Sequence, residues 1–81
     1  MTCQLCGKWG QTEKHHVFQA FNRNNSDKYG AYIFICRDCH NAIHHHPKKY
    51  EWLKEYFQKQ LMTENGWSTE EWMKIFRRNY L

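Results

Sequence analysis

Two Cys-x-x-Cys pairs constrain this chain more than any other feature of its sequence. The pairs are Cys3/Cys6 and Cys36/Cys39, and together they use all four cysteines. This spacing matches a four-thiolate zinc site, in which each tight turn presents two sulfurs on one side. Because four thiolates fill a tetrahedron and leave no position open, we expect a structural zinc ion that stabilises the fold.

The length of 81 residues fits one domain with a small core. We find no apolar run long enough to cross a membrane and no signal-peptide pattern at the start of the chain. We therefore expect a cytoplasmic protein, whose thiols bind metal more readily than they form disulfides. The formal net charge of +4 mildly favours a polyanionic partner such as nucleic acid.

The composition divides the chain into two segments. Residues 1–46 contain every cysteine and histidine, whereas residues 47–81 contain neither. The patterns predict extended segments over 13–18 and 32–35, a loop over 22–30, and helices over 38–46, 48–65 and 69–79. An apolar stripe marks the longest helix, at Tyr50, Leu53, Phe57 and Leu61. Ser68 begins a capping box before the last helix. The prediction is a small α+β fold with two C-terminal helices.

Four histidines lie between and just after the cysteine pairs. His40 and His44 are four residues apart on a predicted helix, so their side chains face one way. His15 and His16 are neighbours in an extended segment, where adjacent side chains point to opposite sides. One of that pair can face a metal ion held by His40 and His44, and the other can lie beside it as a general base. The alternative is a zinc-binding scaffold with incidental imidazoles.

Residues 3–46 resemble the HNH (His-Me finger) endonucleases, especially small phage-encoded proteins with paired cysteines. The resemblance is carried by His15-His16-Val17-Phe18, Asn22-Arg23, Ser26, Lys28-Tyr29-Gly30 and the segment from Cys36 to His40. It implies a ββα-metal finger in which His16 is the catalytic general base. His15, His40 and His44 would hold a catalytic divalent metal, namely Mg²⁺, Mn²⁺, Ni²⁺ or Zn²⁺. The implied reaction is hydrolysis of phosphodiester bonds in DNA. The implied location is the cytoplasm of a cell infected by the phage.

Ala31 departs from the family pattern. It occupies the position at which the family usually has an asparagine that braces the loop between the strands. One interpretation is that another polar side chain braces the loop, and the choices are Asn22, Asn24, Asn25 and Ser26. The other interpretation is an inactive finger.

Two functions are consistent with these features. The first is a metal-dependent HNH-like endonuclease. The second is a catalytically inactive zinc-binding module that binds nucleic acid or a host protein, as an inhibitor or adaptor. Basic residues near the expected site would contact phosphates in either nucleic-acid interpretation: Lys8, Lys14, Arg23, Lys28 and Arg37. His45 and His46 end a predicted helix, and we expect solvent to surround them.

Overall fold

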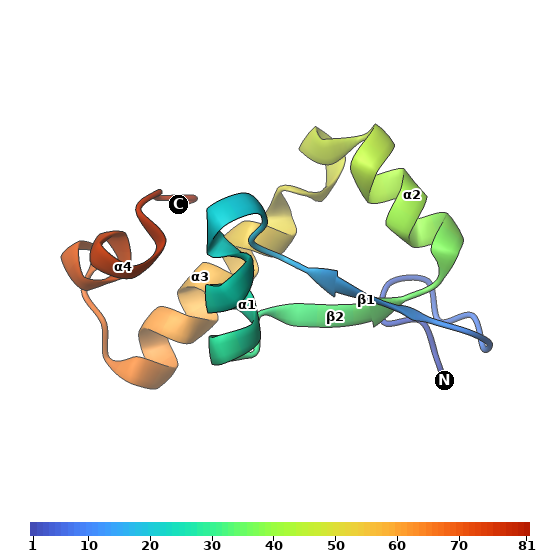
Figure 1. Ribbon diagram of the computed structural model, residues 1–81, viewed down its shortest axis with the longest axis horizontal. Coiled ribbons are helices and arrows are strands. Elements are labelled where there is room, and N and C mark those ends of the chain that lie inside the picture. Colours follow the sequence, from blue (N-terminus) through green and yellow to red (C-terminus); the bar gives the residue numbers. More distant parts are fainter.

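The computed structural model describes residues 1–81 as an α+β fold with one two-stranded sheet and four α-helices (Figure 1). The strands are β1 (Glu13–His16) and β2 (Tyr32–Ile35), and the helices are α1 (Arg23–Tyr29), α2 (Arg37–His45), α3 (Trp52–Asn65) and α4 (Thr69–Phe76). The strands pair in antiparallel fashion, with His15 opposite Ile33.

The molecule is elongated, with principal extents of 39 × 23 × 19 Å. Figure 1 shows the amino-terminal loop at one end of the long axis and α4 with the carboxyl terminus at the other. The antiparallel pair of β1 and β2, called the hairpin below, lies between these ends. Helix α2 follows directly from β2. None of the helices is long and apolar enough to span a membrane.

One continuous core joins the hairpin to the C-terminal helices. Phe18, just after β1, is fully buried, and its ring centroid lies 5.3 Å from Trp72 and 4.9 Å from Phe76. Trp72 and Phe76 stack on each other with centroids 3.9 Å apart. These aromatic rings join Ile33 and Ile35 of β2 in the core. The helical extension, residues 47–81, is therefore packed onto the rest of the chain.

Helix α1 occupies most of residues 22–30, where the sequence predicted a loop. A short 3-10 turn, Ala20–Asn22, leads into α1, and Gly30 ends the helix in the left-handed conformation at φ 73°. Long-range hydrogen bonds hold this polar segment. The side-chain N–H groups of Asn22 and Asn25 donate to the carbonyls of Phe76 and Ile75 at 2.8 and 3.0 Å. These tertiary contacts override the weak helix propensity of Asn and Ser.

The other helices and strands differ from their predicted bounds mainly at their ends. β1 stops at His16, and β2 matches the predicted residues 32–35. The region 48–65 divides into a 3-10 turn, Pro47–Tyr50, and α3. The last helix ends at Phe76, before the predicted 79, because Arg77 takes the left-handed conformation at φ 62°. Ser68 caps that helix as predicted, since its hydroxyl oxygen accepts the N–H of Glu71 at 3.2 Å.

Candidate metal centres

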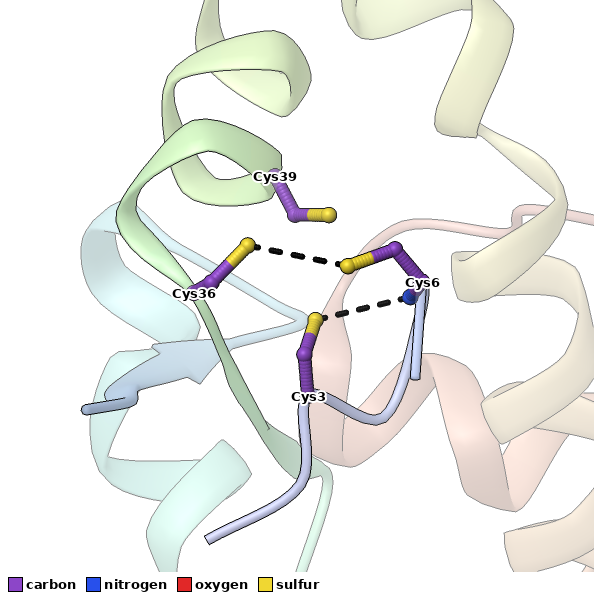
Figure 2. A group of neighbouring side chains, drawn as sticks. All are labelled: Cys3, Cys6, Cys36 and Cys39. Atoms are coloured by element: carbon purple, nitrogen blue, oxygen red, sulfur yellow. Dashed lines mark hydrogen bonds between the residues drawn. The ribbon is translucent and has the colours of Figure 1, made fainter. Parts of the chain in front are cut away.

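The four cysteine sulfurs point toward one another where the amino-terminal loop meets the start of α2 (Figure 2). All four thiols are free, and their Sγ atoms lie within 4.8 Å of one another. The Sγ atoms of Cys6 and Cys36 are 3.8 Å apart. Tetrahedral zinc with Zn–S bonds of ~2.3 Å separates its sulfurs by roughly 3.8 Å. This cluster could therefore hold a structural metal such as zinc.

Local turns and the hairpin bring these cysteines together. Gly7 closes the first turn at φ 79°, a conformation that favours glycine, and its N–H donates to the carbonyl of Cys3 at 2.9 Å. Gln4 fastens this turn to β2, because its backbone N–H donates to the carbonyl of Phe34 and its side-chain oxygen accepts the Phe34 N–H. Cys36 occupies the position just before α2, so the first turn of that helix carries Cys39 inward.

The pKa values of the cysteine thiols also indicate that this cluster suits a bound cation. Burial alone would raise the pKa of Cys3, but backbone N–H groups, chiefly those of Cys6 and Cys36, lower it to about 6. Burial and the surrounding cysteines raise the pKa of Cys39 well above its ordinary value. Four crowded sulfurs cannot all be thiolates without a positive charge between them, and metal binding requires all of them to be deprotonated. The donor set thus matches a bound metal ion.

A second cluster consists of His15 on β1 and His40 and His44 on α2. One ring nitrogen from each lies within 4.8 Å of the other two. The ring centroid of His15 is 5.2 Å from that of His40 and 6.1 Å from that of His44, and the latter two are 4.9 Å apart. The strand and the helix therefore bring the three imidazoles named from the sequence into one group.

His15 has a buried ring nitrogen without a hydrogen-bond partner. Its side chain is 4% exposed, and its Nδ1 is the only buried side-chain nitrogen or oxygen in the molecule without a hydrogen-bond partner. Such atoms are rare because burying an unpaired polar group costs free energy. Burial, followed by the nearby charges of His40 and His44, lowers the pKa of His15 to about 4. The imidazole is therefore neutral at pH 7, as metal binding requires.

Glu13 supports the histidine cluster, and the sequence reasoning did not identify it. The Nδ1–H of His40 donates to Glu13 Oε1 at 3.0 Å, and Arg37 forms a 3.0 Å salt bridge with the other carboxylate oxygen. The hydrogen bond from His40 is the main cause of the lowered pKa of Glu13. It also fixes the tautomer of His40 and leaves Nε2 for a metal ion. Strand alternation, which places Glu13 on the same face as His15, was the signal available in the sequence.

His16 projects toward α1 and also has a carboxylate partner. Its Nε2 lies 2.9 Å from Asp27 Oδ1, which also accepts a 2.7 Å contact from Lys14. Both contacts lower the pKa of Asp27, and the contact from Lys14 has the larger effect. An ionised carboxylate only accepts hydrogen bonds, so Nε2 carries the proton and Nδ1 is left as an acceptor. No sequence pattern pointed to Asp27, because it lies in the segment expected to be a loop.

The four histidines line one open pocket of about 330 Å³. Lys14 and Arg23 are the basic residues on its wall. The other basic residues proposed from the sequence lie elsewhere: Lys8 and Arg37 line a separate hollow beside the cysteine cluster, and Lys28 lines neither. His45 and His46 are exposed and do not line this pocket.

Ser26 braces the loop between the strands. Its hydroxyl donates to the carbonyl of Phe18 at 2.7 Å and accepts the Phe18 N–H at 3.0 Å, and its carbonyl accepts the N–H of Ala31 at 2.8 Å. Asn22 and Asn25 instead bond to the end of α4, and Asn24 is exposed. The side chain of Ala31 is fully buried in the core. An asparagine at this position would place an amide among apolar side chains.

Comparison with known proteins gives no match among family models, curated proteins or solved structures. The motif residues and the geometry of the two clusters are therefore the basis for a functional proposal.

Proposed function

We propose that this protein is a metal-dependent endonuclease that hydrolyses phosphodiester bonds in DNA. The observation that carries the proposal is the position of His16. Its Nδ1 is free to accept a proton, and its imidazole lines the same pocket as the three clustered histidines, one of which has a buried unpaired nitrogen. A general base beside a group of metal-ligating side chains is the arrangement that hydrolytic sites require.

In the proposed reaction, His16 takes a proton from a water molecule through Nδ1 while Asp27 holds the ring through Nε2. The water oxygen forms a bond to phosphorus, the bond from phosphorus to the leaving oxygen breaks, and that oxygen receives a proton from solvent. His15, His40 and His44 would hold a divalent cation, and its positive charge would stabilise the phosphate and the leaving oxygen. Lys14 and Arg23 on the pocket wall attract the phosphate backbone.

The cysteine cluster has a separate role in this proposal. It holds structural zinc and stabilises the hairpin on which the histidines lie. The proposal places the protein in a phage-infected host cell, in the reducing cytoplasm where free thiols persist. The Ser26 brace supports an active site, because it supplies loop contacts where Ala31 cannot.

The test is cleavage of supercoiled plasmid by zinc-loaded protein with added Mg²⁺, Mn²⁺ or Ni²⁺. His16→Ala should reduce the rate by about 10²- to 10⁴-fold, the usual contribution of a general base, and retain its zinc. His40→Ala should also lose cleavage, and a higher metal concentration should restore part of it.

If the wild type cleaves neither plasmid, single-stranded DNA nor RNA with any of these metals, the nuclease proposal fails. The alternative, a non-catalytic module that binds nucleic acid or a host protein, would then account for the basic pocket wall.

A further inference from the structure

A second hollow, of about 110 Å³, adjoins the histidine pocket. It lies among the end of α2, the Pro47–Tyr50 turn and the first residues of α3. His15, Gln19 and His44 line both hollows, so the two meet at the histidine cluster. The helical extension supplies much of the wall, and this hollow therefore lies at the boundary between the two segments of the chain.

The wall of this hollow combines an apolar floor with a few polar groups. Val17, Ile43 and Leu53 are buried and form the floor. Tyr50 and Lys54 also line it and are partly exposed. Binding sites for small organic groups are commonly apolar, with a small number of polar side chains that fix orientation.

The charge of both hollows favours an anion. No aspartate or glutamate lines either of them, whereas Lys14, Arg23 and Lys54 do. Lys54 takes part in none of the molecule's salt bridges, and its ammonium lies 5.4 Å from the ring centroid of Tyr80. A cation without a carboxylate partner, beside the proposed reaction site, is suited to bind a phosphate of the substrate.

We propose that this hollow is a nucleotide subsite, which takes one single-ring base of the cleaved strand while Lys54 binds an adjoining phosphate. The proposal rests on the proposed nuclease function and names part of its substrate. This hollow of about 110 Å³ is smaller than the cavity of about 150 Å³ that encloses a benzene ring. It can therefore take one edge of a single-ring base and has no room for the two fused rings of a purine. A base reaches such a hollow only when it is unstacked, so the preferred substrate has an unpaired pyrimidine beside the cleaved bond.

The experiment is a titration of the full, zinc-loaded chain with thymidine 5′-monophosphate, followed by NMR without a second metal. The methyl signals of Leu53 and Ile43 should shift. Lys54→Gln should weaken this binding about tenfold, as expected for one charged hydrogen bond. The matched control is Lys59→Gln, on the same helix but outside the hollow, and it should bind like the wild type.

Deoxyguanosine 5′-monophosphate and inorganic phosphate complete the test, and both should bind more weakly than the thymidine nucleotide. The subsite is refuted if the shifts fall outside the hollow, if the Lys54 and Lys59 variants bind alike, or if inorganic phosphate binds as tightly as the nucleotide. Equal binding of the guanine nucleotide overturns the single-ring preference. Because no cleavage is measured, these results are independent of the plasmid test. An active enzyme that fails here would keep its proposed function and lose the subsite.

Discussion

The cluster of four cysteines and the cluster of three histidines are assembled in different ways. The cysteine cluster brings together the amino-terminal loop, which a few backbone hydrogen bonds hold, and the start of α2. Its sulfurs contact mainly one another and nearby N–H groups. In the histidine cluster the side chains come from a strand and a helix, and a hydrogen bond to Glu13 orients His40. We therefore expect the cysteine cluster to depend on a metal ion for folding, whereas the fold itself organises the histidine cluster.

The largest effect should come from breaking the cysteine cluster. We expect Cys36→Ser to lose zinc and most of its folded structure at 25 °C. In zinc-finger peptides the ion contributes on the order of 10 kcal/mol, which is comparable to the whole stability of a small domain. Zinc analysis and circular dichroism melting would measure this.

His40→Gln is the matched control, and it should keep its zinc and its melting transition. A cooperative melt of Cys36→Ser close to that of the wild type would show that the fold does not depend on the cysteine cluster.

A smaller effect is expected from Ser26→Ala, which removes the loop brace after β1. The variant leaves the buried N–H and carbonyl of Phe18 without their side-chain partner, so the free energy of unfolding should fall by about 1–3 kcal/mol. One zinc per chain should remain, because the cysteines are untouched. Urea unfolding with zinc analysis would check both statements, and Asn24→Ala, at an exposed position of the same helix, is the control. An unchanged unfolding midpoint in Ser26→Ala would argue against the brace.

The smallest effect concerns the pH dependence of His15. Its pKa falls from an ordinary 6.5 to about 4 on folding, so protons bind the unfolded chain more readily. The contribution of His15 to stability is therefore complete above pH 6.5 and is lost as the pH falls from 6.5 toward 4. Between pH 7.5 and 5.5 the ring signals of His15, assigned with His15→Gln, should stay nearly constant in NMR spectra. A midpoint near 6.5 would mean that this imidazole is not buried as described.

The sequence predicted which cysteines and histidines gather in the two clusters, but it predicted few of the contacts that position them. Cysteine spacing and the helical repeat of His40 and His44 are local patterns, and local patterns can be read from one sequence. In contrast, α1 consists of weak helix formers held by bonds to α4, about 50 residues away. Asp27 lies in α1, so the sequence could not reveal it as the partner of His16.

The core contains another feature that the sequence could not reveal. The predicted apolar stripe is confirmed at Leu53 and Leu61, which are buried, whereas Tyr50, just before α3, and Phe57 are partly buried and pack against the core. Gln58 is equally buried, because its side chain bonds to Asn79 and to the backbone N–H of Tyr80. A buried polar residue is tolerated when distant groups pair with it, and such partners have no signature in a local pattern.

The separation of the two clusters is tested most directly by anomalous X-ray diffraction from a crystal of the zinc-loaded protein soaked in Mn²⁺. We expect a zinc peak among the four Sγ atoms and a manganese peak among the imidazoles of His15, His40 and His44. Data on both sides of the zinc absorption edge distinguish the two elements. A crystal with manganese bound elsewhere and none at the three imidazoles would show that the histidine cluster is not a metal site.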